Sequence, residues 1–376
     1  MTGLLVHGLA GDLAPGDWPA LTAPELAAVV VAFPTAGTLL RVGRPSPRPQ
    51  SAASAVTTTT GPWVVKRHAA AVRRPADLVP EHRFGEHLAA AGLPVPPWAR
   101  TGDGATALGR DGWTYEVQRA GAGTDRYRDA ASWEPYRDPA DAAAAGGLLA
   151  RLHAAAAELP EPARGPRLLS ASGALLHCPD LVAAVAAWAA GHPPTARQLA
   201  RRPWQDDLAR SGAQPHADAA AAVRDLPPLW GHHDWHGSNL LWAPDGAPRV
   251  TAVFDLGLAD LGWAAYDIAT ALERACVGWL APEPELRADD AAALLAGYEE
   301  VRPLPGPERA AVAALLPVVH VEYALSELAY YGELLDSPVR AATAYERYLV
   351  GHLDWWARDP AGRRARAFLE AWAEAG

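Results

Sequence analysis

Cysteine is nearly absent from this chain, which has only two cysteines among 376 residues, and lysine is scarce. Cys178 and Cys276 lie far apart and show no metal-ligand spacing, so the sequence indicates neither a disulfide framework nor a zinc ribbon. Basic residues are also in the minority, because 33 of them stand against 43 acidic residues and the formal charge is −10. A nucleic-acid or anionic-membrane surface needs a basic face, so we expect neither partner.

Long apolar runs are missing as well. Met1 to Ala10 contains no basic segment followed by an apolar run, and the longest early apolar stretch, Leu26 to Phe33, is too short to span a bilayer. We therefore expect a cytoplasmic protein. Half of the residues are hydrophobic, which is enough for a core, and the length favours two packed lobes or domains. The oligomeric state is left open.

The first third of the chain has the pattern of a small antiparallel sheet with helices. Thr22 to Phe33 predicts a short helix with Thr22 as its N-cap, and the β-branched runs between Thr38 and Lys66, separated by turn formers, predict strands. Asp77 to Ala91 predicts the next helix and Trp113 to Arg119 a further strand.

The rest of the chain is mostly helical in pattern. Pro139 to Leu159 predicts a helix, and the apolar spacing is again helical from Ala264 onward. Between them, Leu229 to Leu256 predicts a hairpin with its turn at Asp245–Gly246. We place the boundary near Gly121 to Gly123, which gives a first lobe over residues 1–120 and a second over 121–376.

The densest group of reactive side chains lies in and just after the predicted hairpin. Asp234 and Asn239 are five residues apart on one loop, and Asp255 ends the strand that follows. Phosphoryl transfer requires a carboxylate to orient the attacking hydroxyl and oxygen ligands to hold magnesium on the phosphates. A hairpin can bring these three side chains together for that chemistry.

The pattern His232-x-Asp234-x-x-x-x-Asn239, followed by Asp255, resembles the catalytic and metal-binding signature of the aminoglycoside phosphotransferases and choline kinases. The resemblance implies that Asp234 is the catalytic base or hydroxyl-orienting residue and that His232 positions the loop. It also implies that Asn239 and Asp255 bind Mg²⁺. The implied nucleotide is ATP, with GTP left open.

The same resemblance assigns nucleotide contacts upstream. Lys66, at the end of an apolar strand, corresponds to the phosphate-contacting lysine, and Glu81 in the next helix to its partner, with Glu86 as a competitor. No G-x-G-x-x-G precedes the lysine strand. A loop containing Ser51 and Ser54 occupies that place, and these two serines are the implied phosphate contacts.

Further likeness lies in the predicted second lobe. His153 matches a family histidine at a helix end, and Tyr266–Ala269 matches the segment after the metal aspartate, so we expect Asp267 to brace the catalytic loop by accepting hydrogen bonds. Glu273, Glu322 and Glu327 are the acids chosen as candidate substrate contacts.

The resemblance implies a two-lobed, protein-kinase-like α+β fold, with an antiparallel-sheet first lobe, a larger helical second lobe and ATP between them. The expected enzyme is an ATP- and Mg²⁺-dependent phosphotransferase acting on a hydroxyl of a small molecule, an antibiotic or a metabolite. A Ser/Thr peptide or protein kinase is the enzymatic alternative, and a catalytically silent nucleotide-binding pseudokinase is the alternative of another class. A zinc site made by His232, His233 and His236 is the remaining alternative.

Overall fold

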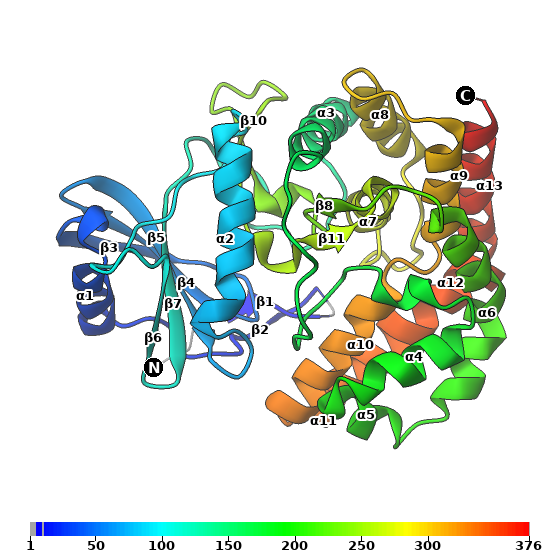
Figure 1. Ribbon diagram of the computed structural model, residues 1–376, viewed down its shortest axis with the longest axis horizontal. Coiled ribbons are helices and arrows are strands. Elements are labelled where there is room, and N and C mark those ends of the chain that lie inside the picture. The colour runs from blue at the N-terminus through cyan, green and yellow to red at the C-terminus, as the bar shows by residue number, and fades with distance from the viewer. Residues whose placement is uncertain (1–4, 10, 376) are drawn as a thin grey trace. The chain divides into compact units, whose positions relative to one another are not determined.

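The chain forms two compact units in a computed structural model that describes residues 5–9 and 11–375 (Figure 1). The first unit runs to Ser132 and also takes in Ser238–Gly257, and the second comprises Trp133–Gly237 and the chain from Leu258 onward. The domain boundary expected near residue 120 stays a prediction.

The first unit is built on a five-stranded antiparallel sheet with the strand order β3-β4-β5-β7-β6. The strands are β3 (Leu39–Pro45), β4 (Ala52–Thr58), β5 (Gly61–Ala69), β6 (Ala107–Arg110) and β7 (Trp113–Arg119). A separate two-stranded ladder joins β1 (Leu5–His7) to β2 (Leu13–Pro15). The strands predicted between residues 38 and 66, and that at 113–119, are therefore confirmed.

Helix α1 (Ala23–Ala32) begins where the sequence predicts it. Thr22 is the N-cap, and its hydroxyl accepts from the Glu25 amide while the Glu25 carboxylate accepts from the Thr22 amide, which makes a capping box. The buried face of α1 joins one core with side chains of the sheet. Helix α2 (Pro75–Ala90) follows β5 and carries both acids considered as partners of Lys66.

The predicted hairpin is confirmed, and the residues just before it form a second ladder. Strands β9 (Leu240–Trp242) and β10 (Val250–Val253) pair in the first unit, on either side of the predicted turn. Strand β8 (Leu229–Gly231) instead pairs with β11 (Asp260–Gly262) in the second unit. The stretch expected as one hairpin therefore contributes to two ladders.

The remainder of the second unit is helical. Its helices are α3 (Pro139–Ala156), α4 (Leu181–Ala190), α5 (Pro193–Leu199), α6 (Trp204–Val223), α7 (Ala264–Cys276), α8 (Ala288–Glu299), α9 (Gly306–Leu315), α10 (Val321–Ala329), α11 (Pro338–Thr343), α12 (His352–Arg358) and α13 (Pro360–Glu374). All residues of α7 are buried. Over residues 5–9 and 11–375, no helix is both long enough and apolar enough to cross a bilayer.

Helices α3 and α8 lie side by side and approach closely at two glycines (Figure 1). A methyl group at Gly146 would overlap the carbonyl oxygen of Leu294, and one at Gly297 would overlap that of Ala143. The two backbones can touch only because glycine, whose side chain is a single hydrogen atom, stands at both positions.

Candidate active site

Lys66 and Asp255 form an ion pair within the first unit. Lys66 lies in β5 and Asp255 two residues after β10, and their Nζ and Oδ1 atoms are 2.9 Å apart. Burial opposes the charge on Lys66, but Asp255 and then Glu116 outweigh it and raise the pKa of the ammonium group. Lys66 is therefore a fixed cation at neutral pH, as a phosphate contact has to be.

Asn239 and Asp255 supply oxygen atoms that suit magnesium. The Phe254 amide donates to the Asn239 carbonyl at 3.2 Å, which joins the backbone before β9 to that after β10. Asp255 has a φ of 59°, a left-handed conformation that is costly outside glycine and tends to occur at functional positions. A carboxylate and an amide oxygen form the hard donor set that Mg²⁺ prefers, so these two residues fit that ion.

A count of residue types gives independent support to two of these positions. Lys66 is the only lysine in the chain and Asn239 the only asparagine, while arginine stands at the other 32 basic positions. Arginine and lysine are not equivalent where a compact ammonium must meet phosphate oxygens. This signal was already available in the sequence, because both residue types can be counted there.

The acids of α2 make their ion pairs with arginines. Glu81 accepts from Arg73 Nη1 at 3.2 and 3.3 Å, and Glu86 pairs with Arg100. The assignment of Glu81 as the partner of Lys66 stays a prediction about the nucleotide-bound protein.

Glu116 is an acid near Lys66 that sequence reasoning missed. It stands opposite Lys66 in the β5–β7 register and accepts from Trp98 Nε1 at 2.8 Å. His68 and His82 each lie 2.9 Å from one of its oxygens. Burial opposes ionisation, but these two histidines hold the pKa of Glu116 well below its usual range. Its strand has no local signal for this role, because both histidines come from elsewhere in the chain.

The two serines of the predicted nucleotide-covering loop lie at the start of β4. In the β4–β5 register Ser54 stands opposite Val65, whereas Ala53 stands opposite Lys66. Successive side chains of a strand alternate between faces, so Ser54 shares the core face with Val65 and is buried. Ser51 precedes the strand and donates its amide to the Pro49 carbonyl. Both serines remain predicted phosphate contacts.

In the second unit, Asp267 holds the loop that contains the candidate catalytic aspartate. Its Oδ2 accepts from the His232 amide at 2.6 Å and its Oδ1 from the His233 amide at 2.8 Å. His153 Nε2 lies 3.1 Å from Oδ2, and the other nitrogen of that ring lies 2.7 Å from the Tyr298 hydroxyl. The bracing role predicted for Asp267 is therefore confirmed.

Replacing Asp267 with asparagine is expected to lower the free energy of unfolding by about 3 kcal/mol at pH 7, because one amide oxygen cannot replace a buried charged acceptor of three groups. Burial opposes ionisation of Asp267, but His153 and His233 lower its pKa, so its contribution is full above the unfolded-state pKa. The difference between wild type and Asp267→Asn should therefore shrink as the pH falls below about 4. Urea unfolding measures it, with the exposed Asp218→Asn as a matched control expected to change stability by under about 0.5 kcal/mol. An equal loss in both variants would contradict the bracing role.

The Asp234 carboxylate is held by a buried arginine. Arg274 Nη1 donates to Asp234 Oδ1 and, at 3.0 Å, to the His233 carbonyl. His236 Nε2 lies 3.3 Å from the same carboxylate, and the Asp234 amide donates to His232 Nδ1 at 3.2 Å. Burial opposes ionisation, but Arg274 and His236 outweigh it and lower the pKa of Asp234. The side chain is thus a fixed carboxylate, and His232 positions its backbone.

Arg274 is a residue that sequence reasoning missed. It lies in α7 under the rings of Trp133 and Tyr323, with its guanidinium carbon 5.0 and 4.8 Å from their centroids. A spacing of seven residues is close to two helical turns, so Arg274 lies on the same face of α7 as Asp267. That spacing could have indicated that Arg274 also faces the catalytic loop.

Two acids proposed as substrate contacts are buried among protein groups. Glu322 accepts hydrogen bonds on both carboxylate oxygens, from Ser170, Ser172 and Ala174, so it fixes the 170–174 segment. Glu273 is fully buried beside two histidines.

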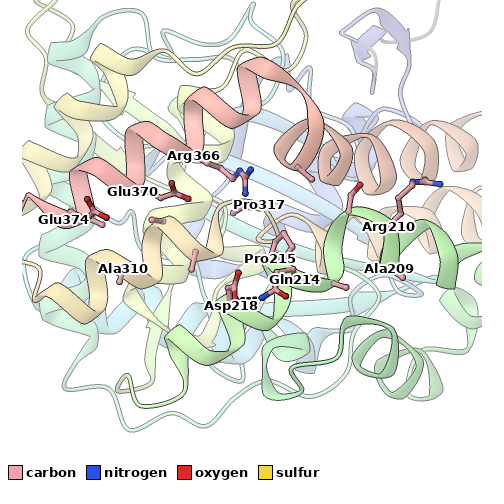
Figure 2. Close-up of a pocket in the computed structure, with 16 residues that line it drawn as sticks. Ala209, Arg210, Gln214, Pro215, Asp218, Ala310, Pro317, Arg366, Glu370 and Glu374 are labelled. Carbon is pink, nitrogen blue, oxygen red and sulfur yellow. Dashed lines mark hydrogen bonds between the residues drawn. The ribbon is translucent and has the colours of Figure 1, made fainter.

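Within residues 5–9 and 11–375, neither of the two three-residue clusters with metal-ligand spacing contains His232, His233 or His236. A hollow of about 710 Å³ in the second unit is lined by α6, α9 and α13 (Figure 2). None of the predicted site residues lies in its wall.

Solved structures with a similar fold cover nearly the whole chain. An aminoglycoside phosphotransferase from Alicyclobacillus acidocaldarius subsp. acidocaldarius DSM 446 is 18% identical, with a TM-score of 0.54 over 93% of this chain and 96% of that one. Amicoumacin kinase in complex with AMP-PNP, Ca²⁺ and Ami is 14% identical, with a TM-score of 0.56 over 90% and 96%. A microcompartment-associated aminopropanol kinase is 17% identical, with a TM-score of 0.55 over 94% and 98%. These structures confirm the kinase-like α+β fold.

Sequence comparison identifies the family. Homoserine kinase from Caulobacter sp. (strain K31) is 33% identical over 140 residues, which are 36% of this chain and 41% of that protein. The chain thus matches less than half the length of this relative. Residues 47–304, more than half of the chain, match the model of the phosphotransferase enzyme family, and they include every predicted catalytic, metal-binding and nucleotide-binding residue. The chain therefore belongs to the phosphotransferase enzyme family.

Proposed function

We propose that this protein is a kinase that transfers the γ-phosphoryl group of ATP, with Mg²⁺, to a hydroxyl group of a small molecule, an antibiotic or a metabolite. The observation that carries the proposal is the ionised Asp234 carboxylate on a loop fixed by Asp267. Family membership and the Lys66–Asp255 pair support it.

Each group has a distinct task in the proposed reaction. Lys66 neutralises phosphate charge, and Asn239 and Asp255 hold the magnesium ion, which supplies further neutralisation when bound. Asp234 accepts a hydrogen bond from the acceptor hydroxyl and orients its oxygen toward the γ-phosphorus. The new oxygen–phosphorus bond forms as the bond to the β-phosphate oxygen breaks, ADP leaves, and the hydroxyl proton passes to Asp234.

The lowered pKa of Asp234 determines how it acts. A carboxylate stabilised by Arg274 is a weak base, so it removes little of the proton before the phosphoryl group has begun to move. Phosphoryl transfer tolerates this, because its loose transition state needs little activation of the nucleophile. Orientation is therefore the larger part of its contribution.

The acceptor and nucleotide are tested together by Mg²⁺-dependent consumption of ATP or GTP by the purified protein. The acceptors are aminoglycosides, macrolides, nucleoside antibiotics, choline, homoserine and Ser/Thr peptides, and Asp234→Ala is the control. Transfer to one small-molecule class by wild type alone would establish the proposal. Transfer only to peptides would establish the protein-kinase alternative. Nucleotide binding without turnover across the panel would favour the pseudokinase. Absence of both turnover and Mg²⁺-dependent nucleotide binding would exclude the small-molecule kinase and the protein kinase alike.

Removing Arg274 should move the acid limb of the activity profile to higher pH. In Arg274→Met the burial of Asp234 is no longer offset by its nearest cation, so the pKa of Asp234 rises, by about 1–3 units for such a neighbour. Turnover of the variant should fall most at the acid end of the profile and approach wild type as the pH rises. Measurement of kcat across the pH range in which both proteins stay folded checks this, with Arg202→Met, whose guanidinium lies over the Tyr345 ring, as the control. An unshifted acid limb would show that Arg274 does not set the protonation of Asp234.

A further inference from the structure

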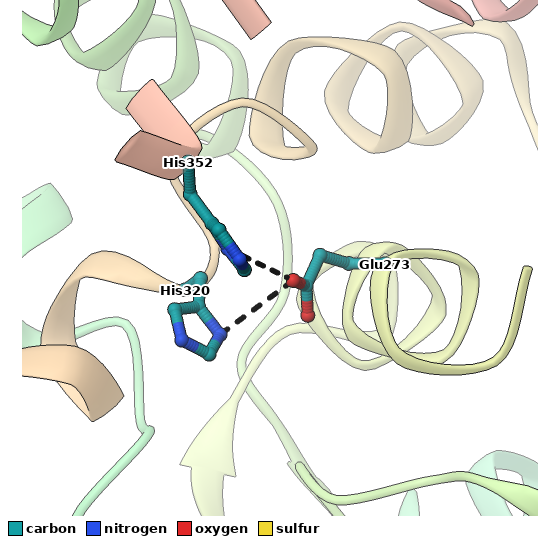
Figure 3. Close-up of side chains that lie close together, drawn as sticks. All are labelled: Glu273, His320 and His352. Carbon is teal, nitrogen blue, oxygen red and sulfur yellow. Dashed lines mark ion pairs between the residues drawn. The ribbon is translucent and has the colours of Figure 1, made fainter. Parts of the chain in front are cut away.

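Three buried side chains of the second unit converge at one point outside the proposed phosphoryl-transfer residues. Glu273 comes from α7, His320 directly precedes α10, and His352 opens α12 (Figure 3). One potential ligand atom from each lies within 4.8 Å of the other two. Their positions in the chain are far apart, so only the fold assembles the cluster.

The separations in this cluster suit a shared ion better than direct hydrogen bonds. Glu273 Oε1 lies 3.3 Å from His352 Nδ1 and 3.6 Å from His320 Nδ1. An N–H···O bond is normally about 2.7–3.2 Å long. Ligands bonded to one Zn²⁺ at about 2.0–2.1 Å in tetrahedral geometry are roughly 3.3 Å apart.

Five polar atoms of the cluster have no hydrogen-bond partner among the described residues. They are both carboxylate oxygens of Glu273, both ring nitrogens of His320 and Nδ1 of His352. All three residues are more than nine-tenths buried. Buried polar atoms are costly without a partner, so this concentration points to a ligand held at the centre.

Aromatic side chains set the orientation of the two imidazoles. Trp279 stacks on His352 with a centroid distance of 3.7 Å, and Trp133 meets His320 edge-on at 5.3 Å. The indole of Trp279 also donates to the Glu273 carbonyl at 2.9 Å. The ring nitrogens are thus directed by packing rather than by hydrogen bonds of their own.

Charge favours a cation at this point. Glu273 is a buried carboxylate and Asp234 a partly buried one, and Arg274, which donates to Asp234, lies 4.0 Å from Glu273. One guanidinium leaves the group with a net negative charge when both imidazoles are neutral. A divalent ion would compensate Glu273 and leave Arg274 to Asp234.

We propose that Glu273, His320 and His352 form a binding site for a divalent first-row transition metal ion of the Zn²⁺ class. Two imidazole nitrogens and one carboxylate oxygen are a recurrent three-ligand set for such ions and leave one coordination position open. The bound ion would tie α7, the start of α10 and α12 together beside Arg274.

The other cluster with metal-ligand spacing lacks this character. Glu81, His82 and Glu116 also lie close together, but their partners are already in place. His82 lies within hydrogen-bonding distance of both Thr106 and Glu116, and Arg73 pairs with Glu81. Hydrogen bonds and ion pairs within the protein thus explain why Glu81, His82 and Glu116 lie together, whereas the cluster at Glu273 has no such explanation.

The test is a Zn²⁺ titration of the full-length protein after chelator treatment, followed by calorimetry without nucleotide. Millimolar Mg²⁺ in the buffer occupies the proposed oxygen site of Asn239 and Asp255, so that site does not add to the measured Zn²⁺ binding. Wild type should bind one equivalent, and Glu273→Gln, which keeps the shape and removes the charge, should bind at least about 100-fold more weakly. Co²⁺ should give the visible spectrum of a low-symmetry nitrogen and oxygen site in wild type alone.

His192→Gln is the matched control, because His192 is a partly buried histidine of the same unit bonded to the Trp188 carbonyl. It should bind Zn²⁺ as wild type does. Zn²⁺ should also raise the melting temperature of wild type and His192→Gln but not that of Glu273→Gln. Equal binding by Glu273→Gln, or no stoichiometric binding by wild type, would overturn the proposal. Neither result depends on turnover, so failure here is separable from failure of the proposed kinase activity.

Discussion

Replacing Asp234 with asparagine is expected to lower kcat by about a thousandfold, within the range of about 10²–10⁴ that a positioned acid or base contributes, with little change in ATP binding. Asparagine keeps the shape of the side chain, but it cannot take the hydroxyl proton and presents one acceptor oxygen in place of two. Single-turnover kinetics with saturating ATP and the acceptor identified by the panel measures the change, and calorimetry measures ATP affinity.

The control for this variant must also remove a carboxylate that forms an ion pair with an arginine. Asp207 pairs with Arg210 at 3.1 Å and accepts from the Tyr345 hydroxyl at 2.6 Å. Asp207→Asn should keep kcat within a few-fold of wild type. Similar losses of kcat in both variants, with similar falls in melting temperature, would trace the Asp234 effect to stability and not to chemistry.

Replacing Lys66 with arginine should lower kcat/KM for ATP by about 10²–10³, the usual cost of losing one well-placed electrostatic contact in a site of this kind. Arginine keeps the charge but spreads it over a planar group that does not reproduce a compact ammonium in the place set by Asp255. Initial rates at varied ATP measure the loss. An unchanged kcat/KM would remove Lys66 from the proposed mechanism.

The single lysine permits a direct check of the same assignment. Apart from the amino terminus, Lys66 carries the only primary amine in the chain, so an amine-reactive reagent followed by mass spectrometry reads its modification without ambiguity. MgATP should slow that modification strongly. Arg110→Lys supplies an internal reference, because Arg110 is half exposed in β6 and a lysine there should react equally with and without nucleotide.

The sequence was sufficient for the elements whose signals are local. The cap at Thr22, the turn at Asp245–Gly246 and the β-branched runs of the sheet each lie within the element that they specify. The β8–β11 ladder was not predicted, because its three-residue strands are separated by about thirty residues and pair only in the folded unit.

The candidate site follows the same rule: residues with a local sequence signal were predicted, and residues placed only by the fold were not. Asp234, Asn239 and Asp255 could be proposed because they lie close together in one recognisable pattern. Glu116 could not, because its partners come from other elements, and Arg274 had only its seven-residue spacing from Asp267 as a signal. Glu322 shows the converse error. Helical spacing assigns a residue to a face of a helix, but it does not say whether that face meets a substrate or the protein interior.

The close crossing of α3 and α8 has a consequence for mutational tolerance. Gly146 lies seven residues, about two turns, before His153, which holds the aspartate that braces the catalytic loop. An added methyl at Gly146 or Gly297 would force the helices apart and move His153 with α3. In a random-mutagenesis screen for lost activity, these two glycines should appear among the sensitive positions, although neither has a side chain with which to contact a substrate.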